Sequence, residues 1–156
     1  MLEVSVPGYH KFRLSHLVLD YNGTIAFDGN ILQGVKEGLV AIKDELRIHV
    51  ITADTFGKAA EKLAQLPCSL HVLPPGDQDI AKRAYVESLG KGATVSIGNG
   101  RNDGLMLKES ALGIAVVQQE GAAVSTLLNA DVVCPDIESA LGLLRNPLRL
   151  AATLRS

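Results

Sequence analysis

Aromatic residues are scarce in this chain, and neither sign of charge predominates. Phe, Trp and Tyr make up only 4% of the 156 residues, so the sequence offers no aromatic platform on which nucleic-acid bases could stack. The net charge is -2 and the pI is about 6.1, which leaves no basic surface to attract nucleic acid or an anionic membrane. We therefore expect neither a nucleic acid nor a membrane as a partner.

Long apolar runs and clustered cysteines are also lacking. The longest apolar runs, such as Leu112 to Val117, are far shorter than the roughly 18 residues of a membrane helix. Residues Met1 to Val4 lack the charged and apolar regions of a signal peptide. The isolated Cys68 and Cys134 predict reduced thiols, and we interpret the four scattered histidines as structural or surface residues. These features predict a cytoplasmic protein.

Short apolar runs alternate with stretches of helical spacing along most of the chain. Most runs are apolar at consecutive positions, as expected of strands that are covered on both faces. The alternation predicts a Rossmann-like three-layer α/β/α fold with a mostly parallel sheet, and the length fits one domain over residues 1–156. The predicted strands are His16–Asp20, Arg47–Thr52, Ser69–Leu73, Ala93–Gly98, Gly113–Val117 and Asp131–Cys134, and the later helices are Asn102–Ser110, Gly121–Asn129 and Asp136–Leu144.

Two segments do not follow this alternation. Asp28-Gly29 lies between short apolar stretches and is a strong hairpin signal. It predicts a small β-hairpin flap over about residues 25–33, leaning over the site that follows Asp20. No segment is long enough to form a large cap domain. Residues 1–14 are expected to add an edge strand to the sheet.

Polar residues follow three of the predicted strands. Asp20 ends the first, Thr52 ends the second, and the glycine-rich turn Gly98–Gly104 follows the fourth. Because open parallel sheets place their sites beyond the carboxyl ends of the strands, we expect these elements to share one site. A carboxylate at such an end, followed by a Gly-Thr turn, is well placed to attack phosphorus. A second acidic turn on a neighbouring strand can hold the cation that this attack needs.

Each of these elements also has a plainer interpretation. Asn22-Gly23 is itself a hairpin dipeptide, so Asp20 could be an ordinary turn residue, and Thr52 could be a helix N-cap. The turn Gly98–Gly104 could simply join a strand to a helix. It could also be a degenerate dinucleotide-binding fingerprint, but its third glycine comes one residue late and Asp103 adds negative charge where a pyrophosphate would sit.

A nearby cation could neutralise both a phosphate and the attacking carboxylate. Lys82, near the start of a predicted helix, is our candidate for this role, although a solvated surface lysine is the commoner case. Lys58, Lys62 and Arg83 are alternatives.

In their order and spacing these residues resemble the motifs of the haloacid-dehalogenase-like hydrolase superfamily. Within it they are most similar to the phosphorylation domain of P-type ATPases, here without a large cap. The strand-end threonine and the helix lysine of the second and third motifs correspond to Thr52 and Lys82. The resemblance covers most of the chain from about His16. The first motif reads Asp20-Tyr21-Asn22-Gly23-Thr24 and the fourth reads Gly98-Asn99-Gly100-Arg101-Asn102-Asp103.

The resemblance implies a role for each of these residues. Asp20 would be the nucleophile that forms an aspartyl-phosphate, and Mg²⁺ would be the cofactor. The ligands of Mg²⁺ would be the Asp20 carboxylate, the Asn22 backbone carbonyl and the fourth-motif residues Asn99 and Asp103. The phosphoryl oxygens of a small phosphorylated substrate would be bound by Thr52, Ala53, Lys82 and Asn102.

Two positions depart from the motifs. Asn22 stands where phosphatases of the superfamily have an acid/base aspartate, and such assistance is worth roughly 10²- to 10⁴-fold, so we expect a slow phosphohydrolase. Asn99 replaces the first acid of the fourth motif, and its amide oxygen can ligate Mg²⁺ but adds no charge. The two changes also suit a catalytically degenerate phosphate- or phosphoprotein-binding regulatory module. A homo-oligomer, with Phe27 and Ile31 of the flap at the contact, is a further expectation.

Overall fold

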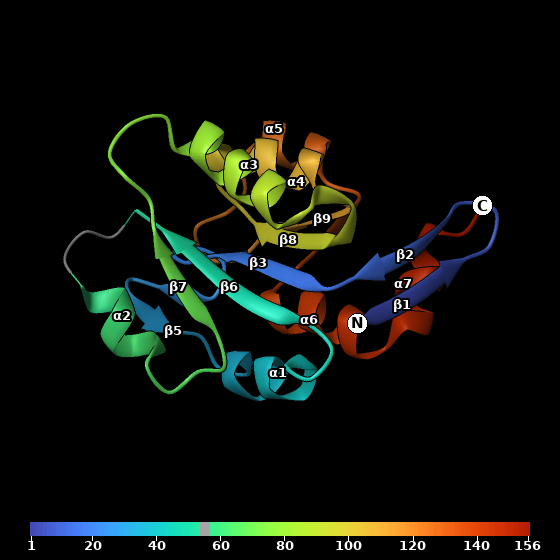
Figure 1. Ribbon diagram of the computed structural model, residues 1–156, viewed down its shortest axis with the longest axis horizontal. Helices are drawn as coiled ribbons and strands as arrows, with labels where there is room; N and C mark the ends of the chain where they lie inside the picture. Colours follow the sequence, from blue (N-terminus) through green and yellow to red (C-terminus); the bar gives the residue numbers. More distant parts are fainter. Residues whose placement is uncertain (54–56) are drawn as a thin grey trace.

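A six-stranded sheet forms the centre of the computed structural model, which describes residues 1–53 and 57–156. Its strand order is β10-β9-β8-β3-β6-β7, and every neighbouring pair is parallel (Figure 1). The predicted α/β class is therefore confirmed. The strands are β3 (His16–Asp20), β6 (Arg47–Thr52), β7 (Ser69–Val72), β8 (Thr94–Gly98), β9 (Leu112–Val116) and β10 (Val132–Cys134), all close to their predicted bounds.

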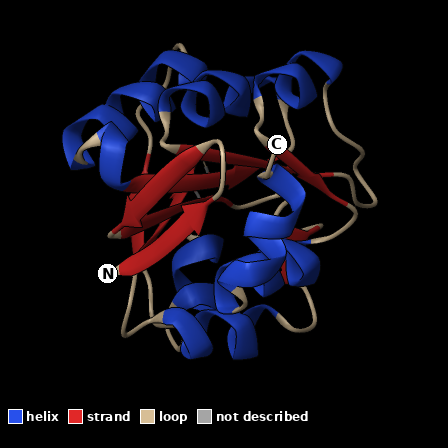
Figure 2. Ribbon diagram, turned by 90° about the vertical axis from the view of Figure 1, so that its right-hand side faces the viewer, coloured by secondary structure: helices blue, strands red, loops and turns tan. Residues whose placement is uncertain are grey.

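Helices cover both faces of this sheet (Figure 2). Every residue of β8 and β9 is buried, which explains why β9 has no polar side chain. Within the described residues, no helix is both long and apolar enough to cross a membrane. One face carries α3 (Gln78–Leu89), α4 (Gly104–Glu109) and α5 (Val124–Asn129), and the other carries α1 (Val35–Ile42), α2 (Lys58–Leu63) and α6 (Ile137–Arg145). The last helix, α7 (Pro147–Leu154), packs beside α6 and against the N-terminal segment.

The order of the strands explains where a site can form. From β3 the chain first adds β6 and β7 on one side, and then crosses to add β8, β9 and β10 on the other. The connections that leave the carboxyl ends of β3 and β8 therefore diverge, which opens a crevice at this topological switch point. Asp20 lies at the end of β3, and the turn that follows Gly98 lies beside it at the end of β8.

Residues 1–14 form a separate antiparallel hairpin, so the prediction that they add an edge strand is wrong. Within residues 1–53 and 57–156, the strands β1 (Leu2–Val6) and β2 (His10–Leu14) pair only with each other. Since β2 ends one residue before β3 begins, the hairpin projects beyond the end of the sheet (Figure 1). Its apolar residues alternate along both strands, and this apolar face is covered by α7, including the buried Leu150.

The predicted hairpin after Asp20 is confirmed. It consists of β4 (Ala26–Phe27) and β5 (Asn30–Ile31), joined by a two-residue turn. Both turn residues, Asp28 and Gly29, have positive φ, at 48° and 77°, as the tight turn of a hairpin requires. The hairpin is a small flap, and Ile31 packs against the main core.

The helix expected from Gly121 begins instead at Val124. Gly121 has a φ of 71°, which no right-handed helix accommodates. Residues 117–123 are therefore a loop between β9 and α5, which we call the β9–α5 loop.

Candidate active site

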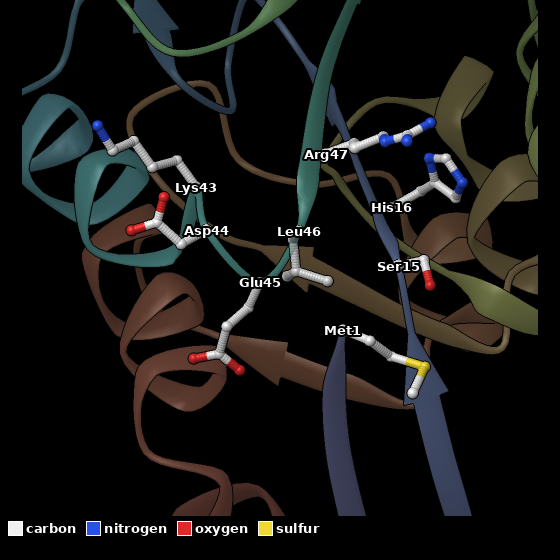
Figure 3. Close-up of a pocket in the computed structure, with 8 residues that line it drawn as sticks. All are labelled: Met1, Ser15, His16, Lys43, Asp44, Glu45, Leu46 and Arg47. Atoms are coloured by element: carbon white, nitrogen blue, oxygen red, sulfur yellow. The ribbon is translucent and has the colours of Figure 1, made fainter.

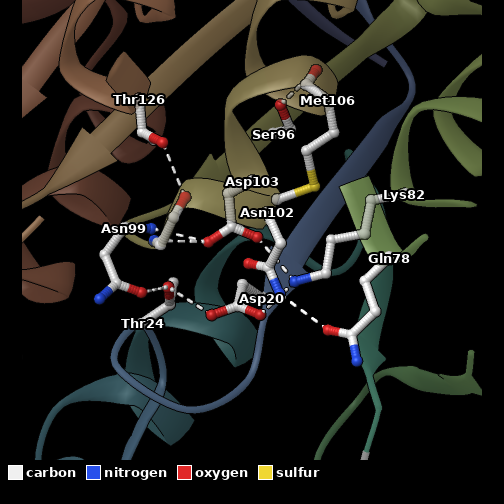
Figure 4. A network of polar contacts seen from close by, with 11 residues as sticks. Asp20, Thr24, Gln78, Lys82, Ser96, Asn99, Asn102, Asp103, Met106 and Thr126 are labelled. Atoms are coloured by element: carbon white, nitrogen blue, oxygen red, sulfur yellow. Dashed lines mark hydrogen bonds and ion pairs between the residues drawn. The ribbon is translucent and has the colours of Figure 1, made fainter. Parts of the chain in front are cut away.

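A buried cluster of charges joins three of the predicted site residues. The Lys82 ammonium on α3 donates to Asp20 Oδ1 at 2.6 Å and to Asp103 Oδ1 at 2.7 Å (Figure 4). Lys82 and Asp103 are fully buried, and Asp20 is only 8% exposed. The structure therefore identifies Lys82, out of the four candidate cations, as the one that meets the predicted nucleophile.

Two carboxylates share one ammonium in this cluster, and the pKa values of Asp20 and Lys82 are shifted in consequence. Burial raises the pKa of Asp20 to about 7; the neighbouring Asp103 adds to the rise, and Lys82 opposes it. Burial alone would lower the pKa of Lys82, but Asp20 and Asp103 hold it well above its ordinary value. With both carboxylates ionised the cluster carries excess negative charge, which favours binding of a cation.

Asp103 faces inward and organises the turn that follows β8. Its Oδ2 accepts hydrogen bonds from the backbone N–H groups of Asn99 at 2.9 Å and Gly100 at 2.8 Å. A β-carbon at Gly98 would lie 2.6 Å from the Asp103 side chain, so glycine is required there. Because its other oxygen meets Lys82, both oxygens of Asp103 are engaged inside the protein.

A polar pocket of about 290 Å³ opens in front of this cluster, at the carboxyl ends of the strands. Most of the predicted site residues line it, whereas Asp103 lies behind them. Asp54, which follows Ala53, lies outside the described residues. The lining consists of Asp20, Asn22, Thr52, Ala53, Gln78, Lys82, Asn99, Gly100, Asn102 and Glu120.

Hydroxyl and amide groups link the elements around the pocket. The buried Thr24 hydroxyl lies between Asp20 Oδ2 at 3.2 Å and Asn99 Oδ1 at 3.3 Å, and so connects the ends of β3 and β8 (Figure 4). Asn102 Nδ2 donates to Gln78 Oε1 at 2.9 Å. Thr52 is buried at the pocket and is not the cap of α2, which begins six residues later.

The β9–α5 loop is bonded to both turns that form the site. Gln118 Nε2 donates to the carbonyl of Gly23 at 3.0 Å and to that of the following residue at 2.9 Å. On the other side, Asn99 Nδ2 donates to the carbonyl of Gly121 at 3.0 Å. The carboxyl end of β9 therefore belongs to the site, as do the ends of β3 and β8.

Sequence reasoning missed Gln78, Gly100 and Glu120 as lining residues, and missed Gln118 as a support for the first turn. Glu120 could have been found. It follows the predicted strand that ends at Val117, so the strand-end rule that selected Asp20 and Thr52 applies to it equally. Gln78 carries no such signal, because it lies in the first turn of α3 and reaches the site only through packing of that helix.

The groups that face the pocket suit a hard divalent cation. Within the described part of the chain, no three His, Cys, Asp or Glu side chains are grouped so as to hold a metal ion by themselves. A cation here would therefore also need neutral oxygen ligands, and the pocket offers the Asn99 amide oxygen and the backbone at Asn22 beside the Asp20 carboxylate. Carboxylate, amide and carbonyl oxygens are the ligands that Mg²⁺ prefers.

A different pocket, of about 540 Å³, lies at the opposite end of the sheet (Figure 3). Its lining mixes acids and bases, and their side chains point in different directions. No set of groups converges there on a common point, so we place the functional site at the carboxyl ends of the strands. This second pocket is lined by Met1, Ser15, His16, Lys43, Asp44, Glu45, Leu46 and Arg47.

Comparison with known sequences finds archaeal relatives of this chain. No protein-family model matches the chain. The uncharacterized protein MJ0073 of Methanocaldococcus jannaschii is 46% identical over 84 residues, which span 51% of this chain and 90% of the relative. The chain belongs to the same family as this archaeal protein.

Solved structures show the same fold at low sequence identity. One is the 3-deoxy-D-manno-octulosonate 8-phosphate phosphatase of Moraxella catarrhalis, in complex with a magnesium ion, a phosphate ion and a KDO molecule. It has a TM-score of 0.69 and 17% identity, over 91% of this chain and 94% of the phosphatase. A zinc-transporting P-type ATPase has a TM-score of 0.60 and 18% identity, over 79% of this chain and 20% of the ATPase. The chain therefore has the haloacid-dehalogenase-like fold without a large cap.

Proposed function

We propose that this protein is a Mg²⁺-dependent phosphohydrolase that acts on a small phosphorylated substrate through an aspartyl-phosphate on Asp20. The observation that carries the proposal is the placement of the Asp20 carboxylate. It lies at the end of a buried strand, contacts the Lys82 ammonium at 2.6 Å, and faces a polar pocket of about 290 Å³. The fold that the chain shares with the phosphatase described above supports it.

In this mechanism Asp20 attacks the phosphorus, and the bond from phosphorus to the leaving-group oxygen breaks. Water then attacks the aspartyl-phosphate, which releases inorganic phosphate and regenerates the carboxylate. Lys82 stabilises the charge on the transferring group, while Thr52, the Ala53 backbone and Asn102 bind its oxygens. Thr24 orients Asp20 through its hydroxyl group.

Mg²⁺, when bound, would neutralise charge on the phosphoryl group. The groups that would hold it are the Asp20 carboxylate, the Asn22 backbone carbonyl and the Asn99 amide oxygen. Asp103 would act on the cation through the turn that it fixes, because its own oxygens are bonded to backbone N–H groups and to Lys82.

Asn22 limits the rate in this proposal. Its side chain lies at the rim of the pocket, where Oδ1 accepts a hydrogen bond from the Gly29 N–H of the flap at 3.3 Å. An amide cannot pass a proton to the leaving group, so turnover is slow and favours substrates that need no such proton. Acyl phosphates and aryl phosphates are of this kind.

The test is hydrolysis of p-nitrophenyl phosphate and acetyl phosphate with and without Mg²⁺, with the Asp20→Asn variant as the control. We expect slow Mg²⁺-dependent release of phosphate that the variant lacks. Turnover equal to that of Asp20→Asn would contradict the proposal. It would favour a phosphate-binding module without catalysis, for which the amides of Asn22 and Asn99 are the supporting observation.

A further inference from the structure

Glu120 is the second acidic side chain that faces the pocket. Of the residues that line it, Asp20 and Glu120 carry the carboxylates, since Asp103 is turned inward. Glu120 comes from the β9–α5 loop and is exposed to solvent. Among the described residues, no hydrogen bond or ion pair engages its carboxylate. A charge without a protein partner at the mouth of a polar pocket is available to a ligand.

The Glu120 carboxylate and the Asn99 amide both lie against Gly23, in space that a larger residue would fill. A β-carbon at Gly23 would collide with Glu120 Oε2 and would also lie 2.5 Å from Asn99 Nδ2 and 2.7 Å from Asn99 Oδ1. The carboxylate and the amide thus lie on the same side of Gly23. On the other side of the amide, the Thr24 hydroxyl connects Asn99 Oδ1 to Asp20 Oδ2. The three oxygen-bearing groups therefore follow one another along a single edge of the pocket.

The loop that carries Glu120 is held in place at several points. Gln118, two residues before Glu120, donates hydrogen bonds to the turn after β3. Asn99 Nδ2 donates to the carbonyl of Gly121, the residue directly after Glu120, and Asn99 O accepts from the N–H of Ala123 at 2.9 Å. An aspartate at position 99 could not make the first of these bonds, because a carboxylate has no N–H to donate.

We propose that Glu120 supplies the second carboxylate of the divalent-cation site, in place of the acid that Asn99 does not provide. The amide at position 99 then has two functions. Its oxygen faces the site as a neutral ligand, and its nitrogen holds the loop that presents the Glu120 charge. The inference rests on the proposed function for the identity of the cation, Mg²⁺, but its test measures binding of the ion alone.

The test is calorimetric titration of the metal-free protein with Mg²⁺, comparing Glu120→Gln with the unmodified protein. We expect the affinity to fall by at least about 10- to 100-fold, the loss typical when a residue that only supports a metal ligand is removed. Glu45→Gln is the matched control, because Glu45 is also exposed and lies at the opposite end of the sheet. It removes the same charge and should leave the affinity unchanged.

A second variant tests whether a carboxylate at position 99 can replace the one at position 120. In Asn99→Asp/Glu120→Gln the carboxylate returns to position 99, and we expect tighter Mg²⁺ binding than in Glu120→Gln alone. An affinity of Glu120→Gln within twofold of the unmodified protein would overturn the proposal for Glu120, while Asp20-dependent hydrolysis would still support the phosphohydrolase. Loss of Mg²⁺ affinity in a protein that hydrolyses nothing would support the cation site and contradict the hydrolase. An unmodified protein that binds no Mg²⁺ overturns both.

Discussion

Replacing the proposed nucleophile with its neutral amide should stabilise the metal-free protein. In Asp20→Asn the buried cluster keeps one carboxylate and one ammonium, so its charges balance. In the unmodified protein, the Lys82 ammonium is shared by two carboxylates at 2.6 and 2.7 Å. Sites built for ligands commonly lower stability in this way, because charges that a ligand would neutralise are held together without it.

The magnitude follows from the pKa of Asp20. Its rise from the ordinary value of 3.8 to about 7 means that the folded state holds the Asp20 proton more tightly than the unfolded chain does. Ionised Asp20 therefore lowers stability increasingly as the pH rises from 3.8 to about 7, by about 4 kcal/mol at about 1.4 kcal/mol per pKa unit. The new amide nitrogen needs an acceptor, and an unsatisfied buried donor costs about 1–3 kcal/mol. We expect a net gain of about 1–3 kcal/mol at pH 8.

Urea denaturation in EDTA at pH 8 and pH 5 measures this difference. The gain should be largest at pH 8 and smaller at pH 5, where Asp20 is mostly protonated in the folded protein. Saturating Mg²⁺ should reduce the gain at pH 8, since it stabilises the unmodified protein more. Asp44→Asn, an exposed aspartate far from the site, is the control and should change little. If Asp20→Asn is no more stable than the unmodified protein at pH 8, our account of the cluster is wrong.

Three further changes test the site and the sheet beside it. Asn22→Asp should raise turnover of an alkyl phosphate, whose leaving group needs a proton, about 10²- to 10⁴-fold, and that of p-nitrophenyl phosphate less; an unchanged steady-state rate on the alkyl phosphate would refute this role. Lys82→Met should abolish hydrolysis and destabilise the protein by about 3–5 kcal/mol, because Asp20 and Asp103 lose their shared cation; urea denaturation measures the loss. Burial, with help from His16 and Arg47, lowers the pKa of His49 to about 4. The contribution of neutral His49 to the free energy of unfolding should therefore be complete above about pH 6.5 and be lost between pH 6.5 and 4, and urea denaturation of a His49→Gln variant should show a shallower decline over this range.

Much of the fold could be predicted because its strands are buried on both faces. Such strands appear in the sequence as continuous apolar runs, and β3 and β6 were predicted with their observed bounds. Residues 1–14 were misjudged because their alternating pattern fits either an edge strand or a separate hairpin. The choice between them depends on α7, nearly the whole chain away, which covers the apolar face of β1.

The histidines show the same limit of local reasoning. Three of the four gather around Tyr85, although nothing in their spacing indicates it. His16 Nδ1 lies 3.1 Å from His49 Nε2, His49 Nδ1 lies 3.0 Å from the Tyr85 hydroxyl, and His71 stacks on the Tyr85 ring. The three histidines come from β3, β6 and β7 and Tyr85 comes from α3, so the strand order and the packing of α3 bring them together.

The candidate site was predictable where its residues follow strands and not where they depend on a neighbouring loop. Asp20, Thr52 and Asn99 line the pocket because parallel strands end at one edge of the sheet. Lys82 could be placed only as one candidate among several cations, since burial of a lysine depends on how α3 packs. Gln118 was missed because its function is to hold another turn through two hydrogen bonds to backbone carbonyls.

The convergence of strand ends also bears on the two asparagines of the motifs. A site assembled from the ends of β3, β8 and β9 does not require a given charge to come from a given strand. Asn99 removes a carboxylate at the end of β8, yet its amide nitrogen bonds to the loop after β9, where Glu120 presents a carboxylate to the same pocket. No residue makes a similar exchange for Asn22 among the described groups that line the pocket, where the acids are Asp20 and Glu120. Loss of charge at position 99 is thus compatible with cation binding, whereas the amide at position 22 is the change that should govern the rate.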